Sequence, residues 1–125
     1  MDYLEPLPPQ CPPDAAIDQA IPVAYRVVGA NPATSACFES QAAKNRPLLE
    51  IDNACSHRSC SMFTSFDKAS NIASRLPKPR ESGPLIATVT IPTGAGRSKI
   101  ARKHIDLWFY KSFNPTASVL KIEEL

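Results

Sequence analysis

The segment CSHRSC brings Cys55, His57 and Cys60 within six residues, and side chains of these types can hold a metal or act on a substrate. Zinc takes such ligands but needs a fourth, which Cys37 or His104 would have to supply from far along the chain. A Cys55–His57 pair could instead be a nucleophile and its base. The C-x4-C spacing is unlike the two tight pairs of a structural finger, so reduced core cysteines with an exposed histidine are favoured and no metal is expected.

A second constellation lies near the C-terminus. His104 and Asp106 are two residues apart, which places both on one face of a strand, where the carboxylate could orient the imidazole as a general base. A structural histidine with its hydrogen bonds satisfied is the alternative. Five basic residues lie between Arg97 and His104. A solvated loop is the favoured interpretation of this cluster, and contact with an anionic partner is the alternative.

The elements that must position these residues follow from hydrophobic periodicity and from prolines. Strands are expected over residues 23–29, 60–66, 85–92, 105–113 and 118–125, with a further short one at 48–51; helices are expected over 13–21, 33–45 and 68–76. Residues 1–13 hold a run of prolines and predict an extended arm. The pattern therefore predicts a single α+β domain over residues 14–125, with a mostly antiparallel sheet of four to six short strands and two or three helices.

Composition narrows the functional classes. A chain of 125 residues with 43% hydrophobic and 21% charged residues is of the size and balance of one folded domain. The formal net charge of +2 gives no reason to expect specific nucleic-acid binding. No apolar run is long enough to span a membrane. The first ten residues, MDYLEPLPPQ, lack the basic and apolar regions of a secretory signal, so a cytoplasmic location is expected.

Three sets of residues occur in a suggestive order along the chain: Arg26 within AYRVV, Thr64 and Ser65 within FTSF, and Glu123 and Glu124 within KIEEL. This order of arginine, hydroxyl pair and late glutamate resembles that of ADP-ribosyltransferase-like domains, which are small split-sheet domains that bind NAD. The resemblance implies that Arg26 contacts the dinucleotide phosphates and that Thr64 and Ser65 shape the nicotinamide pocket. It also implies that Glu123 or Glu124 is the catalytic carboxylate.

The chemistry of these groups suits the implied roles. The planar guanidinium of arginine matches two phosphate oxygens at once. A carboxylate stabilises the positive charge that develops when a glycosidic bond breaks. Purely structural roles stay open for all five residues: Arg26 on a solvent-facing sheet surface, Thr64 and Ser65 in the turn before a helix, and Glu123 and Glu124 on an edge strand.

A protein of a different functional class is the alternative: a non-catalytic interaction module such as an inhibitor, an immunity protein or an effector-associated protein. The aromatic run that contains Trp108 and Tyr110 supports it, because aromatic side chains serve as interface anchors when they are exposed. In that case Trp108 and Tyr110 would contact a protein partner.

Overall fold

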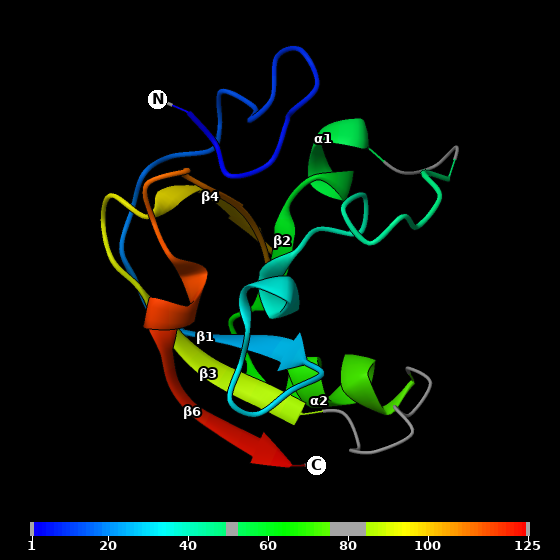
Figure 1. Cartoon of the computed structure of the whole chain (residues 1–125), viewed down its shortest axis with the longest axis vertical. Coiled ribbons are helices and arrows are strands. Elements are labelled where there is room, and N and C mark those ends of the chain that lie inside the picture. The colour runs from blue at the N-terminus through cyan, green and yellow to red at the C-terminus, as the bar shows by residue number, and fades with distance from the viewer. Residues whose placement is uncertain (1, 50–52, 76–84, 125) are drawn as a thin grey trace.

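A six-stranded antiparallel sheet forms the centre of the computed structural model, which describes residues 2–49, 53–75 and 85–124 (Figure 1). The strands are β1 (Ile21–Val28), β2 (Cys60–Phe63), β3 (Leu85–Ile91), β4 (Gly96–Ala101), β5 (His104–Phe109) and β6 (Val119–Glu124). The helices are α1 (Ala54–His57) and α2 (Phe66–Ser74), with 3-10 turns η1 (Ser35–Phe38) and η2 (Pro115–Ser118). The strand order is β4-β5-β2-β1-β3-β6, which confirms the predicted α+β class. No helix within the described ranges is long and apolar enough to cross a membrane.

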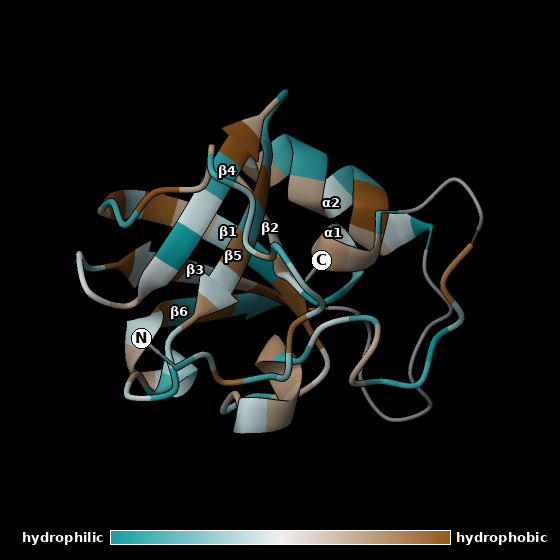
Figure 2. Ribbon diagram, turned by 90° about the horizontal axis from the view of Figure 1, so that it is seen from above, coloured by the Kyte–Doolittle hydropathy of each residue, from teal (hydrophilic) through white to brown (hydrophobic). Residues whose placement is uncertain are grey.

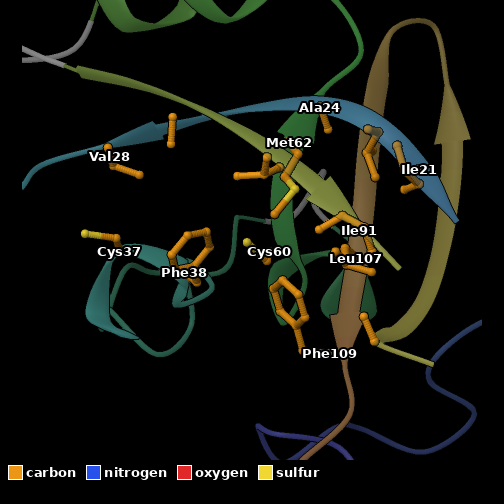
Figure 3. Packing of buried hydrophobic residues seen from close by; sticks show 14 of the residues in the cluster. Ile21, Ala24, Val28, Cys37, Phe38, Cys60, Met62, Ile91, Leu107 and Phe109 are labelled. Carbon is orange, nitrogen blue, oxygen red and sulfur yellow. The ribbon is translucent and has the colours of Figure 1, made fainter. Parts of the chain in front are cut away.

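One face of the sheet carries the larger hydrophobic core (Figure 3). On β2 and β5 the buried side chains of Cys60, Met62, Ile105 and Leu107 belong to this core. Successive residues of a strand point to opposite faces. The residues that alternate with these four, namely Ser61, Phe63, His104 and Asp106, therefore lie on the other face of the sheet.

Helix α2 covers part of that other face. Ala69 and Ala73 of α2 are fully buried and form a second cluster with Phe63 of β2 and Ile86 of β3. The helix begins after Ser65, whose hydroxyl accepts a hydrogen bond from the Lys68 N–H at 3.3 Å. The helix was predicted over residues 68–76, and residue 76 lies outside the described part of the chain.

The proline-rich arm is packed against the C-terminal end of β5. The Leu4 N–H donates to the Phe109 carbonyl at 2.9 Å, and the Lys111 N–H donates to the Asp2 carbonyl at 2.9 Å. The Glu5 carboxylate accepts hydrogen bonds from both the N–H and the hydroxyl of Ser40. These contacts hold the arm over one end of the molecule (Figure 1).

Several predicted elements differ from the observed ones. The helix predicted over 13–21 is wrong: residues 14–20 are irregular, and Ile17 makes an isolated bridge with Ser98. The helix predicted over 33–45 is reduced to η1 and turns. The basic segment predicted as a loop contains β4, whose residues pair with β5 from Gly96 to Ala101. Of the short strand predicted at 48–51, residues 50 and 51 lie outside the described ranges, and residues 48 and 49 are irregular.

Glycine is required at residue 96 by the close pairing of β4 with β5. A Cβ at this position would overlap the Trp108 carbonyl oxygen and lie 2.9 Å from the Phe109 Cα. We expect Gly96→Ala to lower the free energy of unfolding by about 2 kcal/mol or more, because strand backbone cannot move aside cheaply. The control is Gly29→Ala, where the added Cβ meets nothing within 4 Å. Urea denaturation of both variants measures the difference, and equal losses would contradict the pairing.

Candidate functional site

Arg26 is buried at the centre of the molecule, with 5% of its surface exposed. Its guanidinium donates three hydrogen bonds to backbone carbonyls: from Nε to Cys37 at 3.0 Å, from Nη1 to Ser61 at 2.7 Å, and from Nη2 to Glu39 at 3.0 Å. The possibility that Arg26 faces solvent is therefore wrong. The side chain thus links η1 and the residue after it, Glu39, to strand β2.

This arginine lies where two strands separate. The pairing of β1 with β2 is limited to Tyr25 and Phe63, although the other strand pairs extend over four to six positions. Past the Tyr25–Phe63 pair, β1 and β2 are no longer paired, and the Ser61 carbonyl accepts a hydrogen bond from the Arg26 side chain. Buried carbonyls need a donor, and here the guanidinium supplies it. A cleft lies where β1 and β2 separate, and Arg26 of β1 and Ser61 of β2 both line it.

Strands β2 and β5 supply a row of polar side chains to the same cleft. Ser61 pairs with Asp106 in the register of the two strands, so their side chains share a face. The Ser61 hydroxyl is hydrogen-bonded to His104 Nε2. The Asp106 carboxylate accepts hydrogen bonds from Ser59 Oγ at 2.9 Å and from Ser56 Oγ at 3.0 Å. Ser56 belongs to α1, so this short helix contacts the Asp106 carboxylate.

The serine, histidine and aspartate do not form an acyl-transfer triad. His104 Nδ1 lies 3.7 Å from Asp106 Oδ1, which is beyond hydrogen-bonding distance. Each carboxylate oxygen accepts a serine hydroxyl instead. The arrangement presents a carboxylate that is fixed in position, with only 16% of its side chain exposed, beside a histidine and a serine that bond to each other.

The cleft has a volume of about 210 Å³ and is lined by Arg26, Ser61, His104 and Asp106, among others. In the described part of the chain, no carboxylate forms an ion pair with Arg26. Burial lowers the pKa of the nearby Lys44, and the charges of Arg26 and Arg46 add to this effect. Arg26 contributes a positive charge to the lining of the cleft, and Glu39 and Asp106 contribute negative charges.

The residues that the resemblance singled out are not all brought together. Arg26 lines the cleft, but Thr64 and Ser65 do not, because Thr64 is exposed and Ser65 caps α2. Glu123 and Glu124 lie on the edge strand β6, which β3 separates from β1. Glu123 forms an ion pair with Lys121 at 3.2 Å.

The interpretation of the cysteines as reduced thiols is wrong for two of them. Cys11 of the arm and Cys55 of α1 form a disulfide across 44 residues. Cys55 is thus unavailable as a zinc ligand or as a free nucleophile. Cys60 is part of the core, where burial raises the pKa of its thiol. Within the described ranges, no group of three or more histidine, cysteine or acidic side chains is placed to hold a metal.

The aromatic run was expected to offer an exposed surface, and this is wrong for both side chains assigned to a partner. Trp108 is 2% exposed and Tyr110 is 6% exposed. The Trp108 indole N–H donates to the Cys55 carbonyl at 3.0 Å, and the Tyr110 ring packs against Tyr3 of the arm. The arm and α1 cover this side of β5.

Sequence reasoning missed the serines of the cleft. Ser59 and Ser61 flank Cys60 in SCS, and they lie just before the FTSF stretch that drew attention to Thr64 and Ser65. The period of two along a strand that begins at Cys60 was a usable signal, because it places Ser61 on the face opposite the apolar Cys60 and Met62. His104 and Asp106 were recognised as sharing a face, but their proximity to Arg26 depends on the sheet order.

Replacing Arg26 with lysine tests the structural role of the guanidinium. A lysine ammonium is a single point donor and cannot serve three separate carbonyls. We expect Arg26→Lys to lower the free energy of unfolding by about 3 kcal/mol, since at least two buried carbonyls lose their donor. Arg75→Lys, at an exposed arginine that ends α2, is the control and should change stability by less than about 0.5 kcal/mol. Chemical denaturation checks this, and a loss at residue 26 as small as that of the control would contradict the buried network.

Comparison of the chain with models of protein families, with curated proteins and with solved structures finds no match in any of the three.

Proposed function

We propose that the protein binds NAD in this cleft and transfers its ADP-ribose, as the resemblance to ADP-ribosyltransferases implies. The observation that carries the proposal is the convergence of Arg26, Ser61 and Asp106 on one cavity. These are the three kinds of group that the resemblance calls for: a cation for phosphate, a strand hydroxyl for a polar ring, and a carboxylate. Two of the three differ from the residues that the sequence indicated.

Asp106 takes the carboxylate role in this proposal. Breaking the bond between ribose and nicotinamide develops positive charge on the sugar, and a carboxylate already held in place stabilises that charge without reorganising. The two serine hydroxyls on Asp106 hold it in this way. Glu123 and Glu124 are less suited, because they are not among the residues that line the cavity with Arg26.

Arg26 supplies positive charge at the inner end of the cleft. Three of the five N–H groups of a guanidinium are used by the backbone carbonyls here. No carboxylate among the described residues forms an ion pair with Arg26, which favours an anionic ligand at this position. The phosphates of NAD provide such a partner.

A volume of about 210 Å³ holds only part of a dinucleotide, since pockets for drug-sized ligands begin at roughly 300 Å³. A larger open cavity of about 480 Å³ shares His57 with the cleft and is lined by Arg46 and Arg58. In this proposal it receives the adenosine part of the dinucleotide, because the diphosphate is bound at Arg26 in the cleft.

A cytoplasmic location stays a prediction. The Cys11–Cys55 disulfide argues against it, because such bonds persist mainly in oxidising compartments.

Asp106→Asn separates binding from chemistry. We expect calorimetry to show NAD binding to the wild type and to Asp106→Asn with similar affinity, because asparagine keeps the size and shape of the side chain. Nicotinamide release should fall by roughly 100-fold or more, because the neutral amide cannot stabilise a developing positive charge. Thermal melts establish that the variant is folded.

Glu123→Gln and Glu124→Gln are the matched controls, since they remove carboxylates from β6 in the same way. Both should release nicotinamide at the wild-type rate. Loss of activity in a β6 variant with full activity in Asp106→Asn would return the catalytic role to the late glutamates. No heat with the wild type would reject NAD as the ligand.

A further inference from the structure

A second cavity, of about 290 Å³, adjoins the cleft. The two cavities share Asn53, Ser56 and Asp106, so the Asp106 carboxylate borders both. The second cavity is walled on one side by the proline-rich arm, at Pro8, Pro9 and Pro13, and its floor includes Lys99 and Trp108. Lys99 lines neither of the two cavities assigned to NAD.

We infer that this second cavity is the acceptor site of the transfer reaction and that it accepts a phosphate ester carrying a free hydroxyl. The inference rests on the proposed function, in which NAD occupies the first cavity. A transferase must hold donor and acceptor on either side of the reacting atoms, in contact with the same catalytic group. Asp106 is a carboxylate in that position.

Lys99 indicates the charge of the acceptor. It lies directly opposite Asp106 in the register of β4 and β5, so the two side chains share one face of the sheet. Lys99 is exposed and forms no ion pair within the described residues. A lysine ammonium binds phosphate as a point charge.

The step balances without any further reactant. The acceptor oxygen forms a bond to the anomeric carbon of the ribose while the bond from that carbon to the pyridinium nitrogen breaks. The electron pair of the broken bond stays on that nitrogen, and neutral nicotinamide leaves. The proton of the acceptor hydroxyl passes to the Asp106 carboxylate and from there to water.

The cavity is held open by contacts that do not involve a ligand. The disulfide fixes Cys11 of the arm to Cys55 of α1, and the Cys55 carbonyl accepts the indole N–H of Trp108. Proline restricts the backbone, so the arm forms a stiff wall. A preformed site loses little conformational entropy when its ligand binds.

Trp108 is the only tryptophan of the chain and lines this cavity, so its fluorescence reports on the site. Glycerol 3-phosphate is the probe, and glycerol is its uncharged counterpart. We expect a saturable change in fluorescence with the phosphate ester and none with glycerol. Lys99→Ala should raise the apparent Kd by about 10-fold or more, the equivalent of one lost charge-assisted hydrogen bond. Lys68→Ala, at an exposed lysine on α2, is the control and should leave the Kd unchanged.

Absence of a saturable change in the wild type, or an unchanged Kd in Lys99→Ala, overturns the inference. Calorimetry with NAD on the same proteins separates this result from failure of the proposed function, because Lys99 does not line the first cavity and Lys99→Ala should bind NAD normally. Binding of glycerol 3-phosphate that depends on Lys99, in a protein that gives no heat with NAD, would support the phosphate site and overturn its role as an acceptor site.

Discussion

The buried guanidinium of Arg26 is the interaction on which the candidate site depends. Burying a charge is costly unless hydrogen bonds compensate it, and here three backbone carbonyls from two separate segments do so. The same bonds hold Cys37 and Glu39 against Ser61 at the point where β1 and β2 separate. The Arg26 side chain therefore donates to carbonyls that strand pairing leaves without a partner. It also places a positive charge in the cleft.

Asp106 is positioned by a different means. Its own strand sets the direction of the side chain, but its two hydrogen-bond donors come from Ser56 of α1 and from Ser59 just before β2. Helix α1 has only four residues, too few to be stable alone. Its support is tertiary: Asn53 accepts the N–H groups of Cys55 and Ser56, and the disulfide ties Cys55 to the arm. The geometry of the carboxylate thus depends on residues far away in the sequence.

The limits of sequence reasoning follow from these contacts. Residues 85–92 were predictable as a strand because they form a continuous β-branched run, and a helix after FTSF was predictable from the spacing of Ala69 and Ala73. Strand β4 was not predictable, because its cationic residues are typical of a loop and its strand conformation depends on pairing with β5. The resemblance placed its carboxylate at Glu123 and Glu124 because they come late in the chain. Strands β5 and β6 each lie two strands from β1, and only the three-dimensional structure shows that the cavity beside Arg26 is lined from β5.

The arm links the two halves of the candidate site. Its Glu5 binds Ser40, which closely follows the Cys37 and Glu39 carbonyls that Arg26 holds, and its Cys11 is bonded to α1, which holds Asp106. In the proposed function Arg26 binds the phosphates and Asp106 stabilises the sugar, so the distance between the two side chains must match the ligand. Each is anchored to the same twelve-residue stretch of chain, from Asp2 to Pro13. Displacement of the arm would therefore shift the positions of both charged side chains at once. A stiff, proline-rich segment is suited to this place in the fold because it resists such displacement.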